Sequence, residues 1–494
     1  MKKQMPVLFA LLGVLLFFTA GCAKEDVASS QEILIQVWGS HDFWKGEQSP
    51  GQRTVQDFNK KYAGKIRVEA RYMPGPEYNT AIQAAIASNE LPDLFFNPGG
   101  TDIRTMVALG LARPLDEFVS DTWKQQFYPG SFSEGINVIN GKTYSWPLAG
   151  PQLGSILYYN QDVLQKAGLD PNAPPKTWDA LRQMAKAITD KGRGDVYGIV
   201  FGGAETGLST FVQGFAATVS PQEATGFNFK TGKYAYDSKA ILDSFQLLSQ
   251  LKQDGTILPS SYTLKTVEAG VLFGQGKAGF LVDGRARMWI TKRDVPEVKM
   301  GLAPVPSPTG SNKPTQYYIP AAASGYVISS KTKHAEEVGK FINEAFASAV
   351  FYEKYINSAV AVTPFPAINE KKSLYPYPEY ETFVQLHRDL MRVRPDPAVR
   401  NPEAAKVIVE LGTLEQTNVK PNFSELLQSL LTGAQKDAEG TLKKYNEKMN
   451  KGLQDAIGKV QNKGTKINPD DFTFPNWNAE KDYTAEDYGL TKKD

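Results

Sequence analysis

The sequence predicts an α/β protein with two lobes, each built on a mainly parallel sheet flanked by helices. The chain has 494 residues, more than one hydrophobic core commonly serves, so it is expected to divide. Short apolar runs alternate with helical periodicities, which is typical of βα units and parallel sheets. The run at 33–38 is continuously apolar except for one residue, as in a strand buried on both faces. Ligands of such sheets bind beyond the carboxyl ends of the strands, so a cleft between the lobes is expected.

Residues 1–21 are predicted to be a lipoprotein signal peptide. Lys2 and Lys3 precede an apolar stretch at 6–18 that is too short for an ordinary membrane span, and small residues follow it. Cys22, the only cysteine, stands at the expected cleavage point and would carry the lipid anchor, palmitate included. Thr19 occupies a position that is usually aliphatic in such signals, so an ordinary secretory signal is the alternative. A polar tether is expected at 22–31.

Composition narrows the possible functions. Lys2 and Lys3 account for the formal net charge of +2, so the remaining chain is formally neutral and nothing predicts nucleic-acid binding. A single cysteine allows neither a disulfide nor a thiolate metal site within the chain. His41, His334 and His387 lack metal-ligand spacing, and HExxH, GxSxG and Walker motifs are absent from the sequence. No metal, cofactor or catalytic residue is therefore predicted.

The first part of the mature chain is expected to form three strands separated by two helices. Strands are predicted at 33–38, 68–73 and 94–96, where apolar or alternating runs end in turn residues. Helices are predicted around 54–62 and 78–86, because apolar residues recur there at helical spacing. The loops after the first and third strands should then lie at one edge of the sheet.

Apolar stripes predict further helices. Asp237 is expected to cap a helix over 241–251, a second stripe covers 338–346, and a long amphipathic helix is expected over 434–457. The stretch 467–494 mixes aromatic rings with charged residues, so it is expected to be an irregular tail that its rings hold against the surface.

Four motifs in order carry a resemblance to a known family. GKTYSWP at 141–147, LYYNQD at 157–162, AGL at 167–169 and PKTWDAL at 175–181 resemble the family 1 extracellular solute-binding proteins of carbohydrate ABC importers, which are maltose-binding-protein-like. Thr177 suits an N-cap in the last motif, so these residues are expected to be structural. Further stretches extend the likeness, at 88–94, 273–280, 301–306 and 325–329.

The resemblance implies a type II periplasmic-binding-protein-like fold with its ligand cleft at the hinge. The first lobe would comprise 32–148 and 316–360, the second 149–315 and 361–465, with a C-terminal tail at 466–494. Motifs at 474–477 and 482–488 look like the tail of a subgroup of oligosaccharide-binding lipoproteins from Gram-positive bacteria.

Binding a sugar requires aromatic rings that stack on pyranose faces and planar polar groups that bridge hydroxyls. Loops after the strands at 33–38, 94–96, 198–201 and 279–282 supply both, and the resemblance adds positions at the crossovers. Asp283 and Trp289 rank highest, although each ring could instead pack in the core. The expected ligand contacts are Trp38, His41, Asp42, Trp44, Asn97, Gly100, Thr101, Asp102, Trp146, Gln152, Gly203, Glu205, Asp283, Arg285, Trp289, Tyr317 and Tyr318.

The resemblance implies a monomeric, non-enzymatic receptor that binds an oligosaccharide and delivers it to the transmembrane subunits of an ABC permease, which a cytoplasmic ATPase drives. Lipid would hold it on the outer face of the cytoplasmic membrane, in a Gram-positive bacterium. Two alternatives stay open: a receptor for a non-sugar solute, and a surface glycoside hydrolase in which Asp102 and Asp283 face each other. A calcium ion at 468–471 is less expected than a solvated acidic turn.

Overall fold

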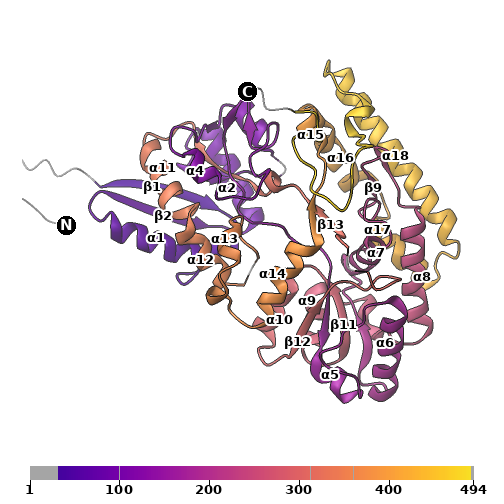
Figure 1. The fold of residues 1–494 in the computed structure, drawn as a ribbon. Coiled ribbons are helices and arrows are strands. Elements are labelled where there is room, and N and C mark those ends of the chain that lie inside the picture. The colour runs from indigo at the N-terminus through magenta and orange to yellow at the C-terminus, as the bar shows by residue number, and fades with distance from the viewer. Residues whose placement is uncertain (1–31, 100, 312, 360, 491–494) are drawn as a thin grey trace, which may run out of the picture.

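Two β-sheets form the framework of the protein. The computed structural model describes residues 32–490 except 100, 312 and 360, so Gly100, Cys22 and the expected signal lie outside the described residues. In Figure 1, one sheet lies with α1 and α2 in the body on the left, and the other with α5 and α6 in the body at lower right. We call these bodies the first and second lobe. This arrangement confirms the predicted α/β class.

The first lobe has a five-stranded sheet in the order β2-β1-β3-β14-β4. Its strands are β1 (Ile33–Gly39), β2 (Ile66–Tyr72), β3 (Leu94–Phe96), β4 (Ala112–Arg113) and β14 (Tyr326–Ser329). The helices of this lobe are α1 (Pro50–Lys61), α2 (Gly75–Ser88), α3 (Ile103–Ala108), α4 (Asp121–Lys124), α11 (Ala335–Phe341) and α12 (Ala349–Asn357).

The second lobe has a four-stranded sheet in the order β12-β7-β11-β8. Its strands are β7 (Ile156–Asn160), β8 (Tyr197–Val200), β11 (Ala278–Asp283) and β12 (Met300–Ala303). Its helices include α5 (Gln161–Lys166), α6 (Trp178–Gly192), α7 (Gly207–Ala217), α8 (Lys239–Gln253), α9 (Thr266–Gly274), α10 (Ala286–Asp294), α17 (Phe423–Thr432) and α18 (Ala438–Asn462).

Each sheet has one strand that runs against the others. In the first lobe β14 is antiparallel to both β3 and β4, whereas β1 is parallel to β2 and β3. In the second lobe β7 is antiparallel to β11 and β12, whereas β11 is parallel to β8. Each reversed strand follows a segment that enters from the other lobe, so no βα unit of its own lobe sets its direction.

Local sequence explains where several helices begin. The Thr177 hydroxyl accepts a hydrogen bond from the Ala180 amide at 3.1 Å, as its predicted role as N-cap of α6 requires. The predicted cap of α8 was wrong by one residue, because Ser238 and not Asp237 caps the helix. The expected helix at 434–457 begins later and ends later, at the bounds of α18, because Asp437 provides its cap.

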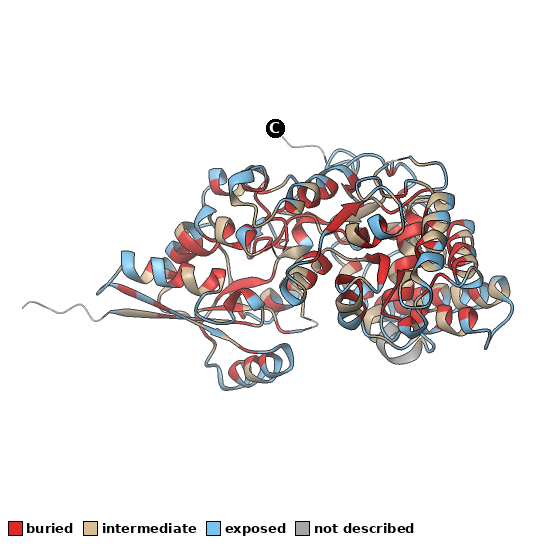
Figure 2. Cartoon of the chain, turned by 90° about the horizontal axis from the view of Figure 1, so that it is seen from below, coloured by how far each residue is buried: buried red, intermediate tan, exposed pale blue. Residues whose placement is uncertain are grey.

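A hydrophobic core continues from the first lobe into the second. On β7, Ile156 and Tyr158 face the same cluster as Trp146 and Tyr326 of the first lobe, whereas Leu157 and Tyr159 face a separate cluster of the second lobe. This split follows the two-residue alternation of a strand. Buried residues accordingly run through the middle of both bodies in Figure 2.

The segments that join the lobes are tied to one another. Strand β13 (Gln316–Tyr318) pairs in parallel with β15 (Met391–Val393). The Gln316 side chain bonds both backbone groups of Ser155, accepting from its amide at 3.1 Å and donating to its carbonyl at 2.7 Å. The Gly150 amide donates to the Val362 carbonyl at 3.0 Å. Bundled connections of this kind suit a hinge.

The C-terminal tail lies on these connections. The Tyr483 amide donates to the Val393 carbonyl at 2.9 Å, and Asp482 accepts from the Val393 amide at 2.7 Å. Phe474, Trp477 and Tyr483 are buried together in one small cluster. Helix α14 (Glu379–Leu390), which comes between β12 and the tail in the sequence, packs on β12. Among the described residues, no helix has the length and apolar character that a membrane crossing requires.

Candidate functional site

The expected site residues follow the carboxyl ends of strands in both lobes. Strands β1 and β3 end at Gly39 and Phe96, and strand β11 ends at Asp283. The pKa of Arg293 on α10 is raised mainly by its hydrogen bond to Asp294, and the charge of Asp42 from the first lobe adds to the rise. The charge of Asp42 in the first lobe therefore acts on α10 of the second lobe.

The loop after β1 brings a carboxylate and an imidazole to this edge. Asp42 is exposed and accepts a hydrogen bond from the Tyr72 hydroxyl at 3.2 Å. The His41 ring stacks on Phe43, with centroids 4.9 Å apart, and meets the edge of Phe96 at 4.4 Å. Burial lowers the pKa of His41 to about 4, against the opposing charge of Asp42, so the ring is neutral near pH 7.

The loop after β3 is held by its own polar side chains. The Asn97 amide group donates to the Thr101 carbonyl at 2.5 Å. Asp102 accepts from the Thr105 amide at 2.7 Å and is the N-cap of α3. One carboxylate oxygen of Asp102 is thus engaged by the helix, and the side chain remains half-buried. Gly100, also expected to contact ligand, lies outside the described residues.

Two of the expected stacking tryptophans are core residues. Trp44 is 1% exposed and its indole nitrogen donates to the Tyr326 hydroxyl at 2.6 Å, while Trp146 is fully buried. A Cβ on Gly51 would lie 2.4 Å from the Trp44 ring, so α1 covers one side of that indole. The prediction that Trp44 and Trp146 contact ligand is therefore wrong for this conformation. Trp38 is half-buried, with the Arg71 guanidinium 5.5 Å from its ring centroid.

Asp283, ranked highest from sequence, holds the turn from β11 into α10. One oxygen accepts from the Gly284 amide at 2.7 Å, and the other accepts from Arg287 Nε at 2.8 Å. Arg287 is 4% exposed and also donates to the Thr266 carbonyl. Both carboxylate oxygens of Asp283 are thus engaged within the protein.

Gly203 and Glu205 also have structural partners. Glu205 accepts from the amide and the hydroxyl of Thr266, at 2.8 and 2.5 Å, and these bonds lower its pKa. Its side chain is exposed beside a cavity of about 350 Å³ that α17 closes. Gly203 is buried, and a Cβ there would lie 2.7 Å from the Ser261 carbonyl oxygen. Close packing explains this glycine.

Trp289 lies where sequence reasoning placed a stacking ring, next to a cavity. The indole is half-buried on α10 and the Arg293 guanidinium is 5.1 Å from its ring centroid. The cavity has a volume of about 500 Å³. It is lined by Trp289, Lys292, Arg293, Pro296, Asn357, Ser358, Ala359, Pro376 and Tyr377.

Sequence reasoning identified part of a polar cluster beside α10 and missed the rest. Arg285 Nε donates to Gln152 Oε1 at 2.6 Å. Burial raises the pKa of Tyr355, and the positive charge of Arg285 partly offsets that rise. Burial lowers the pKa of His387 to about 4, and the charge of Arg285 adds to that decrease. Tyr355 and His387 come from α12 and α14, far along the chain, so no local motif indicates them. We call these four residues the floor cluster.

Tyr317 and Tyr318 lie under the tail. The Tyr317 hydroxyl donates to the Ala479 carbonyl at 3.0 Å, and its ring centroid is 4.9 Å from that of Trp477. Tyr318 lines an apolar cavity of about 680 Å³ together with Tyr128, Tyr483 and Tyr488. The tail and the hinge strands occupy their surroundings, so the structure does not place these tyrosines with Trp289 or Asp42.

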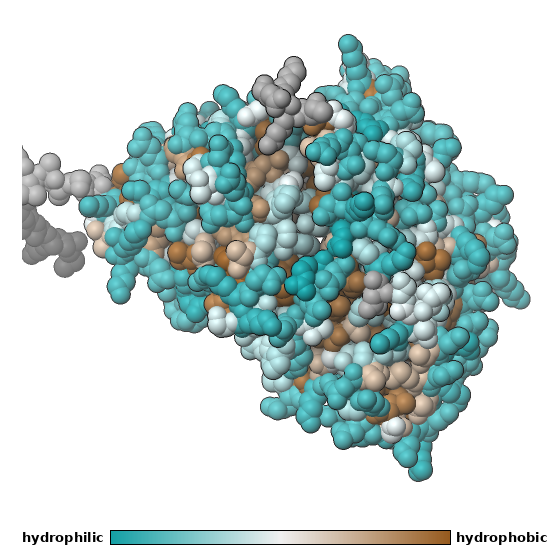
Figure 3. All heavy atoms as spheres, viewed as in Figure 1, coloured by the Kyte–Doolittle hydropathy of each residue, from teal (hydrophilic) through white to brown (hydrophobic). Residues whose placement is uncertain are grey.

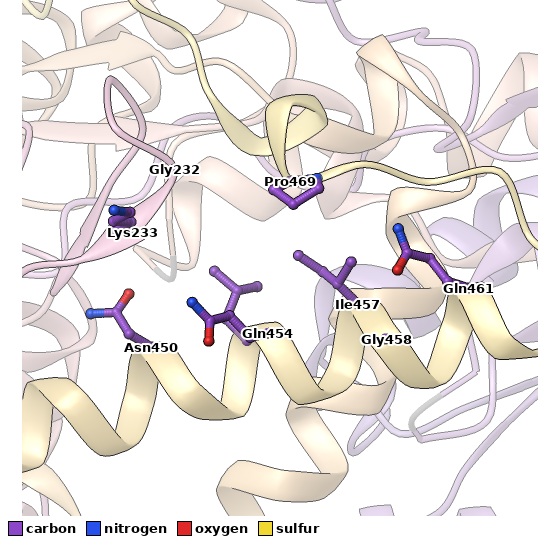
Figure 4. Close-up of a pocket in the computed structure, with 9 residues that line it drawn as sticks. Gly232, Lys233, Asn450, Gln454, Ile457, Gly458, Gln461 and Pro469 are labelled. Atoms are coloured by element: carbon purple, nitrogen blue, oxygen red, sulfur yellow. The ribbon is translucent and has the colours of Figure 1, made fainter.

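Other surface features do not adjoin the strand ends. Figure 4 shows a pocket of about 220 Å³ on α18, beside Lys233 and Pro469. The face seen in Figure 3 is mostly hydrophilic, with small apolar patches, some of them between the two bodies. At the acidic turn, Asp471 accepts from the amide groups of Asn468 and Asn401. Within the part of the chain that the structure describes, no group of three or more His, Cys, Asp or Glu is arranged to hold a metal.

Comparisons with known proteins find relatives over much of the chain. Residues 45–350 match the family model of the bacterial extracellular solute-binding proteins. The chain is 24% identical over 321 residues to the melibiose/raffinose/stachyose-binding protein MelE of Bacillus subtilis, covering 62% of this chain and 68% of MelE. It is 27% identical over 401 residues to the sn-glycerol-3-phosphate-binding periplasmic protein UgpB of Agrobacterium fabrum. That match covers 78% of this chain and 84% of UgpB. With a binding protein of Brucella abortus, the match spans only about half the length of that relative, 55%.

Solved structures share the fold over most of the chain. RafE from Streptococcus pneumoniae is 18% identical with a TM-score of 0.60, and the match covers 86% of this chain and 99% of RafE. The sugar-binding protein MalE from Xanthomonas citri is 16% identical with a TM-score of 0.59, and the match covers 87% of this chain and 99% of MalE. At these identities the likeness establishes the two-lobed fold alone.

Proposed function

Because this chain belongs to the bacterial extracellular solute-binding proteins, we propose that it captures an oligosaccharide between its lobes and delivers it to an ABC permease for import. The observation that carries the proposal is the cavity of about 500 Å³ that Trp289 on α10 lines together with Asn357, the last residue of α12 in the first lobe. The charge of Asp42, after β1, also acts on Arg293, which lines the same cavity. An indole and hydrogen-bonding side chains are what a sugar requires. The relative MelE, named for three galactosyl sugars, supports the same ligand class.

The engaged carboxylates favour a receptor over a hydrolase. Glycoside hydrolysis needs two carboxyl groups free to act on one bond. Asp102 caps a helix, and Asp283 is paired with the buried Arg287. Asp283 is thus not available as an acid or nucleophile, and Asp102 alone does not make the pair of carboxyl groups that hydrolysis needs, so no catalytic residue is proposed.

Transport would work by closure about the bundled connections. A ligand that contacts both lobes favours the closed form, because it gains contacts there that the open form lacks. The transmembrane subunits of the permease would bind that closed form, and a cytoplasmic ATPase would drive import. The protein would act as a monomer.

A lipid on Cys22 would hold the receptor on the outer face of the cytoplasmic membrane, in a Gram-positive bacterium. The apolar stretch and the cysteine in the first 22 residues support this anchor. A Cys22→Ser variant is expected to leave the membrane fraction for the medium, as shown by blotting both fractions. A variant that still sediments with membranes would contradict the anchor.

Calorimetry and scattering test the function. Titration with a panel of plant and bacterial oligosaccharides should give stoichiometric binding with no released product, and small-angle scattering should show a smaller radius with the bound sugar. Release of shorter sugars, with loss of that activity in Asp102→Asn or Asp283→Asn, would favour hydrolysis. If only peptides, polyamines or polyols bind, the chain is a receptor for a non-sugar solute.

A further inference from the structure

The floor cluster contains a charged group with no acidic partner. Arg285 is half-buried, and its only side-chain hydrogen bond among the described residues goes to the neutral Gln152. We propose that the guanidinium of Arg285 binds an anionic group on the transported sugar, so that the ligand is an acidic glycan. This inference rests on the proposed function and names its ligand class.

The other cations of α10 already have carboxylate partners. Arg287 pairs with Asp283, and Arg293 pairs with Asp294 at 2.7 Å. Lys292 pairs with Glu379 at 2.7 Å. Arg285, the N-cap of α10, has no carboxylate partner among the described residues, and of its nitrogens only Nε donates a hydrogen bond there, to Gln152. Its two terminal nitrogens keep their donors available in the fork geometry that matches a carboxylate or phosphate.

The immediate surroundings of Arg285 leave its charge uncompensated. Tyr355 is 7% exposed and His387 is 2% exposed. A tyrosine is neutral near pH 7 at its ordinary pKa, and burial keeps His387 neutral by lowering its pKa to about 4. His387 Nε2 is buried without a hydrogen-bond partner among the described residues. A partly desolvated charge among neutral groups is unfavourable unless an anion joins it.

Helix α10 adds to the positive potential at this place. Arg285 is the N-cap of this nine-residue helix, yet no side chain caps its first turn and no acid stands in that turn. The positive end of the helix dipole acts in the same direction as the guanidinium, and the nearby Asp283 carboxylate is already paired with Arg287. The helix end contributes to an anion site whose main component is Arg285.

Matched pairs of ligands test the proposal. The probes are oligogalacturonates, oligoalginates and glucuronoxylan oligosaccharides, each beside its carboxyl-reduced neutral counterpart, and hexose 1-phosphates beside free hexoses. In calorimetry the wild-type protein is expected to bind at least one acidic member about ten- to a hundredfold more tightly than its neutral partner. Arg285→Gln should abolish that preference while neutral binding remains, and Arg285→Lys should keep part of it.

Arg388→Gln is the matched control, because Arg388 is an exposed arginine on α14 that pairs with Asp389. It removes the same charge and should keep the acidic preference. Equal affinities within every bound pair, or a preference that survives Arg285→Gln, would overturn the anion site and leave sugar binding intact. Binding confined to hexose phosphates would identify phosphate in place of uronate as the anion. If no glycan binds at all, the proposed function fails as well.

A measurement without ligand checks the environment of Arg285. Its charge is one of the effects that lower the pKa of His387, so Arg285→Gln should raise that pKa above about 4. Titration of the imidazole signals by NMR measures the value. An unchanged pKa would contradict the uncompensated charge on which the inference depends.

Discussion

Asp283 and Arg287 lie four residues apart and form an ion pair of 2.8 Å in which the arginine is almost fully buried. Removing the carboxylate leaves the buried guanidinium without its partner. Asp283→Asn is therefore expected to lower the free energy of unfolding by about 3 kcal/mol, measured by urea denaturation. The matched control is Asp294→Asn, which breaks the exposed pair with Arg293 and should leave the free energy of unfolding nearly unchanged. Equal losses in the two variants would refute the structural role of Asp283.

Gly270 tests the packing around the same arginine. A Cβ at this position would lie 2.0 Å from Arg287 Nη1, and Arg287 cannot move without leaving Asp283 and Thr266. Gly270→Ala should therefore destabilise the protein by about 1–3 kcal/mol. Gly452→Ala on α18 has open space around its Cβ and should stabilise by about 0.5–1 kcal/mol. A neutral effect of Gly270→Ala would mean that the guanidinium can move aside.

The buried His387 predicts a loss of stability in acid. Burial lowers its pKa from 6.5 to about 4, so between these values the unfolded chain binds a proton that the folded protein does not. The free energy of unfolding should fall as the pH falls from about 6.5 to about 4, with a contribution of about 1.4 kcal/mol per pH unit. His41, whose pKa is also lowered to about 4, adds a contribution of the same sign. The free energy of unfolding, measured by urea denaturation at several pH values, should depend less on pH in His387→Gln than in the wild type. The same pH dependence in both proteins would contradict the lowered pKa of His387.

Trp289 is an expected stacking ring that lines a cavity. Trp289→Ala should weaken binding of whichever glycan the calorimetric panel identifies by about 1–2 kcal/mol, because the indole face is lost. Trp289→Phe keeps a smaller ring and should fall between the alanine variant and the wild type. If the alanine variant binds within about 1 kcal/mol of the wild type, stacking at this position is not a major contribution.

The sequence was informative where the chemistry is local. The motif at 175–181 predicted the start of α6, and the strand ends at 39 and 96 were located within a residue or two. Even the role of Asp283 had a local signal, because Arg287 follows it at i+4 in DGRAR. That spacing identifies an ion pair when the second residue lies in a helix, as it does in α10.

Long-range packing set the limits of prediction. Trp44 and Trp146 follow polar loops, yet both indoles are buried against Tyr326, which comes some 180 or more residues later. The charge of Arg285 acts on Tyr355 and His387, although α12 and α14 come far later in the chain than Gln152, and His387 lies more than 100 residues after Arg285. No periodicity or spacing in one sequence reports such contacts, since they depend on how the lobes pack.

The position of β14 has a consequence for the order of folding. This strand lies between β3 and β4, although β4 ends at Arg113 and β14 begins at Tyr326. The sheet of the first lobe therefore stays divided while the ribosome synthesises the strands of the second, whose own sheet needs nothing beyond residue 303. The sheet that begins first is completed last, and its unpaired strand edges must avoid aggregation in the interval.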